Sequence, residues 1–234
     1  HPLYKKGANL SKSFLQGAGT RVRGSGNYYM RAKAGNSIRL YMRGFQLGTY
    51  PDKPRYFIYD PQGKLVKHGS LTLGKVQKKQ FTPKKDGIYQ LTTFARRNCT
   101  SVRIDAPHWV IAPPSYKNDQ LSLRICIYAP RLYFYVPADI KQFTVYARTP
   151  GGRERCALRV VAPNGETVES NEFGQELELK IPVSSDKRGG VWSMVIENPQ
   201  KGTLEDLKLR TQDDQGNLYF FSESPQALLI NSAK

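Results

Sequence analysis

Cysteine and histidine are scarce in this sequence of 234 residues, which has three of each. The three cysteines are too few and too far apart for a disulfide framework or a zinc site. No run approaches 18 apolar residues, so the sequence predicts no transmembrane helix. We find no nucleophile elbow, zinc-binding helix or phosphate-binding loop. These absences favour a non-catalytic globular protein that needs no metal ion or cofactor and does not insert into a membrane.

Acidic residues are scarce in one half of the chain. Residues 1–117 hold 22 Lys/Arg and only 4 Asp/Glu, a net charge of +18, whereas residues 118–234 hold 14 and 15, a net charge of −1. A basic field of that size attracts polyanions and speeds their capture, and salt screens it. Solubility is the alternative explanation, but a charge that serves solubility alone need not avoid one half of the chain.

The hydrophobic pattern predicts an all-β protein. Short alternating runs such as Ile38–Arg43 and Gln142–Arg148 are typical of strands with one buried face, and no stretch of 11 or more residues carries the 3.6-residue period of a helix. Five pairs of segments recur in the same order, about 100 residues apart: Tyr28–Tyr29 with Tyr133–Phe134, Ile38–Arg43 with Phe143–Arg148, Asp60–Val66 with Ala162–Val168, Gly87–Leu91 with Gly190–Met194, and Val102–Ile104 with Leu207–Leu209. We therefore expect two tandem antiparallel β-sandwiches of jelly-roll or immunoglobulin-like type, over residues 1–113 and 118–234.

Three segments of the second half carry a family resemblance: Arg131–Pro137, Ala162–Val168 and Gly190–Ser193. Together they resemble the pre-peptidase C-terminal type of β-sandwich, a module appended to secreted bacterial hydrolases. The resemblance implies a non-catalytic accessory domain, often carbohydrate-binding, that is secreted or located at a bacterial cell surface. The matched motifs are structural, so no binding residue is carried over from the family.

A comparison of the two halves singles out the lysines of one region: Lys64, Lys67, Lys75, Lys78, Lys79, Lys84 and Lys85. The first two align with Glu166 and Glu169 on the same predicted hairpin, and acidic residues also follow that hairpin in the second half. The fold thus accepts a charge of either sign at these positions, and binding of a polyanion is the simplest explanation for the lysines. Charge pairing between the two domains is the alternative.

Side-chain alternation predicts a binding face in the same half. If Ile38, Leu40 and Met42 face the core, the residues between them face outward, and we expect side chains of the neighbouring strand to join them. Tyrosine rings can stack on sugars, while guanidinium groups bind sulfate or carboxylate through two hydrogen bonds. The expected polyanion-binding residues are Arg31, Arg39, Tyr41, Arg43, Lys64, Lys67, Lys78 and Lys79, and the expected stacking residues are Tyr29 and Tyr41.

The sequence therefore predicts a module that binds an acidic polysaccharide, sulfated or uronate, through its basic first domain, alone or beside a catalytic domain of the same parent chain. A structural spacer in a surface protein or larger glycosidase is the main alternative. A nucleic-acid binder is another, because bases also stack on aromatic rings. The sharpest enzymatic alternative is a copper polysaccharide oxygenase, with His1 and either His68 or His108 as ligands.

Overall fold

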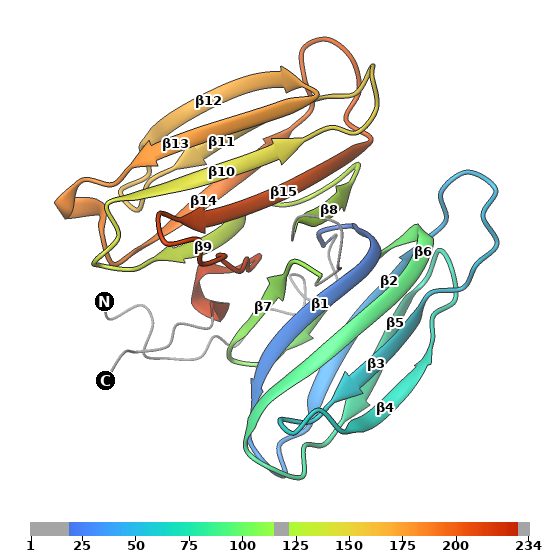
Figure 1. Ribbon diagram of the computed structural model, residues 1–234. Coiled ribbons are helices and arrows are strands. Elements are labelled where there is room, and N and C mark those ends of the chain that lie inside the picture. Colours follow the sequence, from blue (N-terminus) through green and yellow to red (C-terminus); the bar gives the residue numbers. More distant parts are fainter. Residues whose placement is uncertain (1–18, 115–121, 229–234) are drawn as a thin grey trace. The chain divides into compact units, whose positions relative to one another are not determined.

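The computed structural model describes residues 19–114 and 122–228, which form β-strands, turns and two short 3₁₀ helices (Figure 1). Within these ranges no helix is long and apolar enough to cross a membrane. The chain divides into two compact units. The first consists of the residues up to Ala112 together with those from Gln226 onward, and the second is Pro113–Pro225. Both are built of antiparallel strands, which confirms the predicted all-β class.

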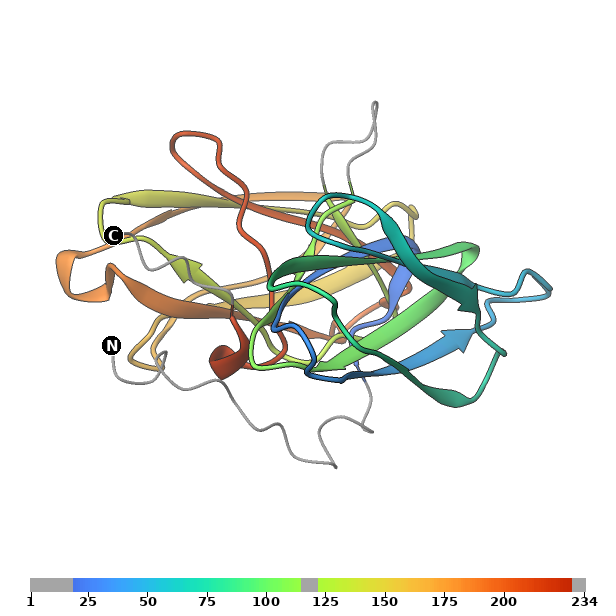
Figure 2. The same ribbon diagram turned by 90° about the horizontal axis from the view of Figure 1, so that it is seen from below.

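The first unit contains seven strands: β1 Val22–Ala32, β2 Ile38–Phe45, β3 Arg55–Tyr59, β4 Leu65–Ser70, β5 Val76–Phe81, β6 Gly87–Asp105 and β7 Trp109–Ala112. The long strand β6 changes partners along its length, with an irregularity between Phe94 and Cys99 in which Arg96 has a φ of 50°. Residues 87–94 of β6 lie in the order β7-β1-β6-β3-β4, and residues 99–105 lie in the order β6-β2-β5. Figure 2 shows these strands in blue to green. Bulges and bends within a strand are what form the corners of a sandwich.

The second unit contains eight strands and the helix η2: β8 Leu123–Cys126, β9 Leu132–Val136, β10 Gln142–Arg148, β11 Arg155–Val161, β12 Thr167–Gly174, β13 Glu176–Pro182, η2 Ser185–Lys187, β14 Gly190–Glu197 and β15 Asp206–Asp213; the helix η3, Pro225–Ala227, follows. Its two sheets have the orders β12-β11-β14-β9 and β13-β10-β15-β8. Between them lies an aromatic cluster in which the Phe143 and Trp192 ring centroids are 5.0 Å apart and those of Phe134 and Phe143 are 5.4 Å apart. Aromatic pairs of this kind stabilise a core beyond the area that they bury.

Five strand pairings of the first unit recur in the second, one of them as two separate pairs. The pairs β2–β5, β2–β6, β3–β4 and β3–β6 correspond to β10–β13, β10–β15, β11–β12 and β11–β14, while the two halves of the β1–β6 pair correspond to β8–β15 and β9–β14. The matched hairpins agree in detail as well. The N–H of Asp60 donates to the carbonyl of Lys64 (2.9 Å), as that of Ala162 does to Glu166 (2.8 Å). These pairings set which residues of the two units occupy equivalent places.

A glycine packs against each of these hairpins. A Cβ atom on Gly87 would lie 2.6 Å from Cγ of Pro61, and one on Gly190 would lie 2.5 Å from Cγ of Pro163. Real Cβ atoms do not approach that closely, so glycine is required at both places. The sequence alignment of Gly87 with Gly190 thus reflects the same close backbone approach in both units.

The observed registers correct two of the aligned segments. Tyr29 pairs with Gln90 and Tyr133 pairs with Ser193, so Tyr29 corresponds to Tyr133 rather than to Phe134. A slip of one residue exchanges the buried and exposed sides of a strand. The Val102 segment is displaced by two residues, because Arg103 pairs with Tyr41 where Arg210 pairs with Tyr146.

Candidate functional site

The five residues predicted to form one binding face lie on two separate surfaces: Tyr29 and Arg31 on β1, and Arg39, Tyr41 and Arg43 on β2. Tyr29 and Arg31 do not join the residues of β2, because β6 lies between β1 and β2. They are opposite Gln90 and Ile88, on the outer side of the sheet to which β3 and β4 also belong. The expectation of a single face was wrong on this point, since alternation predicts which side a residue faces but not which strand is its neighbour.

The outer side of the β6-β2-β5 sheet carries Arg39, Tyr41, Arg43 and Lys78. Two of these side chains are engaged within the protein. The Nε–H of Arg39 donates to Oδ2 of Asp105 at 2.6 Å, and the guanidinium of Arg43 lies 4.8 Å from the centroid of the Phe45 ring. The charge of Arg39 is therefore partly balanced by Asp105.

The second unit repeats the central pair of this surface. Tyr41 is opposite Arg103, and in the second unit Tyr146 is opposite Arg210, whose guanidinium lies 4.2 Å from the Tyr146 ring. A cation–π contact of that kind stabilises two neighbouring strands. Because the near-neutral unit keeps the pair, Tyr41 is explained by the fold without any ligand.

The lysines of β4 and β5 lie on edge strands. The ammonium group of Lys67 donates to the backbone carbonyl of Gln80, so it spans from one edge strand to the other, and Lys79 is half-buried beside Leu40. Charge on an edge strand prevents pairing with another chain. The corresponding edge strand β13 carries Glu178 at the place of Lys78. A charge of either sign protects an edge strand, so edge protection does not explain why the charges of the first unit are positive.

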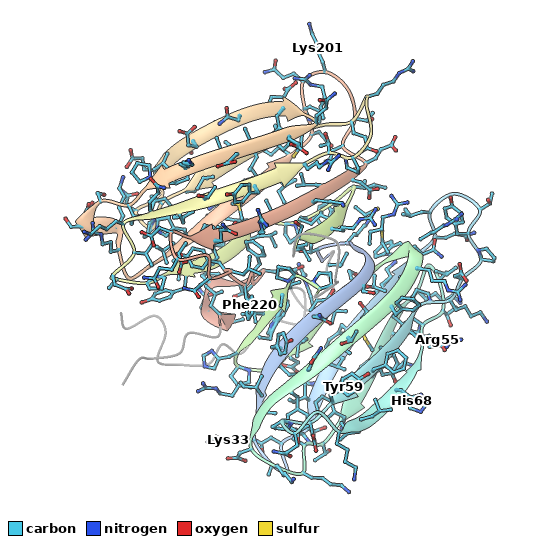
Figure 3. All side chains as sticks on the ribbon, in the orientation of Figure 1. Lys33, Arg55, Tyr59, His68, Lys201 and Phe220 are labelled. Atoms are coloured by element: carbon cyan, nitrogen blue, oxygen red, sulfur yellow. The ribbon has the colours of Figure 1, made fainter. Side chains whose placement is uncertain are left out.

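A different surface of the first unit has the features of a ligand platform. We call it the aromatic face: the outward side of β1, β3, β4 and the first half of β6. Its residues are Asn27, Tyr29 and Arg31; Arg55, Phe57 and Tyr59; His68; and Ile88, Gln90, Thr92 and Phe94. Arg55, Tyr59 and His68 lie along one side of the unit in Figure 3. Sequence analysis assigned only Tyr29 and Arg31 of these residues to a polyanion-binding site, and His68 to the copper alternative.

Aromatic side chains flank a polar strip on this face. Phe57 is opposite His68, and their rings are stacked with centroids 6.4 Å apart. Beside them, the Thr92 hydroxyl donates to the Asn27 side-chain oxygen at 3.0 Å, and the Gln90 amide donates to the Thr92 hydroxyl at 3.1 Å. These amide and hydroxyl groups retain further hydrogen-bonding capacity at the surface.

Apolar groups of the aromatic face are open to solvent. Ile88 is 39% exposed and Phe94 is 43% exposed, while Phe57 and Tyr59 are half-buried. Contiguous exposed apolar surface bordered by polar groups is typical of an interaction site. The segment Arg55–Tyr59 is aromatic or apolar at each of its last four positions, so its sequence does not show which side faces outward. Only the buried state of Tyr56 and Ile58 shows this.

The corresponding surface of the second unit is occupied by its own ion pairs. Arg159 stands where Phe57 stands, and it binds Glu197, which takes the place of Phe94, through hydrogen bonds of 2.9 and 2.7 Å. The hydrogen bond raises the pKa of Arg159 and lowers the pKa of Glu197. Arg155 and Glu172 form a second pair on the same side, at 3.3 Å. The charged side chains of this surface are therefore paired with one another.

The histidines of the described residues have other environments. His68 stacks on Phe57, and Nδ1 of His108 lies 3.2 Å from the carbonyl oxygen of Leu228. Burial lowers the pKa of His108. In the described ranges, no group of three or more His, Cys, Asp or Glu residues is placed to hold a metal ion. His1, the central ligand of the copper alternative, lies outside the described residues.

Neither a protein-family model nor a curated protein sequence matches the chain, so the resemblance to the pre-peptidase C-terminal type stays a prediction. Among solved structures, the tandem domain CBM22-1-CBM22-2 from Paenibacillus barcinonensis Xyn10C is 11% identical, with 83% of this chain and 82% of that chain covered and a TM-score of 0.26. The Pleurotus ostreatus lectin is 12% identical, with 90% and 78% covered and a TM-score of 0.25. Both scores are too low to bear on function.

Proposed function

We propose that the first unit binds an acidic polysaccharide and that the aromatic face is where the sugar lies. One observation carries this proposal: the aromatic face exposes rings beside a polar strip, while the equivalent surface of the second unit is closed by the pair of Arg159 and Glu197. Two versions of one fold thus differ at the same place in the way that a binding and a non-binding surface would differ.

The side chains of the face suit the parts of an acidic sugar. The rings of Phe57 and Tyr59 offer flat apolar surface for the apolar side of a sugar ring, while the amides of Asn27 and Gln90 supply donors and acceptors for hydroxyl groups. Arg55, opposite Phe94, adds a planar guanidinium at one end of the face. A guanidinium binds sulfate or carboxylate through two parallel hydrogen bonds.

The charge of the first half supports the acidic nature of the sugar. Edge strands require charge but not a particular sign, as β13 shows with Glu178 at the place of Lys78. A net charge of +18 in residues 1–117 therefore selects for a negatively charged partner. We further propose that the units are tandem copies of one fold, divided near residues 113–118, and that the protein acts as a secreted or cell-surface module.

The proposal is tested by affinity electrophoresis of the whole chain in gels with a sulfated polysaccharide, a polyuronate, a neutral glucan or single-stranded DNA. We expect retardation by the acidic glycans, and a loss of affinity of about tenfold or more in Phe57→Ala and in Tyr59→Ala, a cost of about 1.4 kcal/mol. Neither substitution changes the charge, so the loss reports ring contact. Arg159→Ala, at the place equivalent to Phe57, is the control in the second unit, and it should lose much less affinity than the two aromatic variants although it removes one positive charge.

Three results would overturn the proposal. Equal retardation by the neutral glucan would exclude recognition of charge. Unchanged binding in both aromatic variants would exclude the aromatic face. Tighter binding of DNA than of either acidic glycan, lost in Tyr59→Ala, would show a nucleic-acid platform instead.

A further inference from the structure

Three turns meet at one end of the first unit, next to the aromatic face. The N–H of Gly35 donates to the carbonyl of Pro83 (2.9 Å), and the N–H of Ala34 donates to Oδ1 of Asp86 (2.8 Å). The ammonium of Lys85 donates to the side-chain oxygen of Gln62 at 2.9 Å. The turns after β1, β3 and β5 are therefore tied together into one surface.

Four exposed lysines gather on these turns: Lys33, Lys64, Lys84 and Lys85. We call them the lysine end, and Figure 3 labels Lys33 there. The two aspartates among them serve the turns: Asp60 Oδ1 accepts from the backbone of Gln62 and Lys64, and Asp86 accepts from Ala34. The formal charge of the lysine end with these aspartates is still positive.

The equivalent end of the second unit has a balanced charge. Glu166 stands where Lys64 stands, and its carboxylate is 2.7 Å from the ammonium of Lys187. That hydrogen bond lowers the pKa of Glu166. Asp186 and Arg188 flank Lys187 with opposite charges. The turns can thus form without a cluster of lysines, so folding does not explain the lysine end.

The aromatic face leads directly into the lysine end. Tyr59 is followed by the Asp60 turn, and Arg31 is two residues before Lys33. Along β6, the seven residue-to-residue steps from Phe94 to Gly87 span about 23 Å at the usual rise of a strand. A ligand that follows the strands would therefore pass the rings first and meet the lysines at one end.

We propose that the lysine end is a subsite for the sulfate or carboxylate groups of the glycan, so that the polysaccharide runs along the strands of the aromatic face. This inference rests on the proposed function. The ammonium group is a compact charge on a flexible stem, so it accepts anionic groups without demanding one geometry. The face would then recognise the sugar, and the lysine end would recognise its charge.

The test compares two triple variants of equal charge in the whole chain. Lys33→Gln/Lys64→Gln/Lys84→Gln removes charge from the lysine end, and Lys53→Gln/Lys75→Gln/Lys78→Gln removes the same charge from other exposed positions. Titration calorimetry would measure binding of a polyuronate and of the same polymer with its carboxyl groups reduced to alcohols. For the first variant we expect a 10- to 100-fold loss toward the polyuronate, a salt slope lower by about 2 to 3, and no change toward the reduced polymer.

The outcomes separate the two proposals. Equal losses in both triple variants would overturn the subsite, because the lysines would then act only through the net charge. Equal affinity of the original chain for the polyuronate and the reduced polymer would overturn it too, since charge would not be recognised. Failure of the original chain to bind any acidic glycan would overturn the proposed function itself.

Discussion

Asn98 offers the clearest test of what holds the first unit together. It follows the bend of β6, its side chain is fully buried, and it makes three hydrogen bonds to the loop between β2 and β3. Its oxygen accepts from the N–H of Leu47 at 2.9 Å, and its amide donates to the carbonyls of Tyr50 (3.1 Å) and Asp52 (2.9 Å). One side chain thus satisfies three backbone groups of a loop that has no strand partner there.

We expect Asn98→Ala to lower the free energy of unfolding by about 2–4 kcal/mol, because each hydrogen bond contributes roughly 0.5–1.5 kcal/mol and the freed backbone groups are partly shielded from water. Asn98→Asp should cost more, since it loses both donors and buries a carboxylate. Urea unfolding would measure the change, followed through Trp109 fluorescence in a Trp192→Phe background, since each unit has one tryptophan.

Asn36→Ala is the control, because Asn36 is exposed in a turn, and a surface change should stay within about 0.5 kcal/mol. A loss below about 1 kcal/mol for Asn98→Ala would refute this reasoning. It would show that water replaces the three bonds and that the loop is not held by the side chain.

Three further predictions concern charge and burial. The double substitution Lys64→Glu/Lys67→Glu should lower the free energy of unfolding by about 1 kcal/mol or less, because the second unit carries glutamates at the equivalent places. It should nevertheless weaken binding of every polyanion in the gel assay, and unchanged retardation of a folded double variant would contradict this. The pKa of Glu197 is lower in the folded chain than its unfolded value of 4.5, so its ion pair contributes stability above pH 4.5 that is lost as the pH falls through the folded pKa. Glu197→Gln should therefore flatten the decline in melting temperature between pH 5 and pH 3, and an identical decline in the variant would refute this. Burial raises the pKa of the Cys156 thiol to about 12, so a thiol reagent at pH 8 should modify it only after unfolding, and rapid labelling of the folded chain would count against its burial.

The difference between the two units is what turns a basic composition into a functional argument. A lysine on an edge strand is explained by protection of that edge, and a tyrosine beside an arginine is explained by packing, as Tyr146 and Arg210 show. Neither explanation accounts for Phe57 standing where the other unit has a paired Arg159. The contrast at equivalent places therefore points to the aromatic face more strongly than the number of cations does.

Local patterns were sufficient to predict several of the strands and the two matched hairpins. The alternation of Ile38, Leu40 and Met42 predicts a strand with one buried side, and all three are buried. The turns at Gly63 and Gly165 have φ values of 76° and 88°, a conformation that glycine adopts without strain. Each of these features depends on residues close together in the chain, so the sequence carries the whole signal.

The neighbours of each strand were decided only by the tertiary structure. Tyr29 follows the predicted alternation but is not a neighbour of Tyr41, because β6 lies between β1 and β2. The outward side of β3 was likewise hidden, since Tyr56 and Phe57 have similar hydrophobic character and only the register with β6 buries one and exposes the other. Pairing between distant strands depends on how the whole core closes, and a period of two residues carries no information about the partner strand.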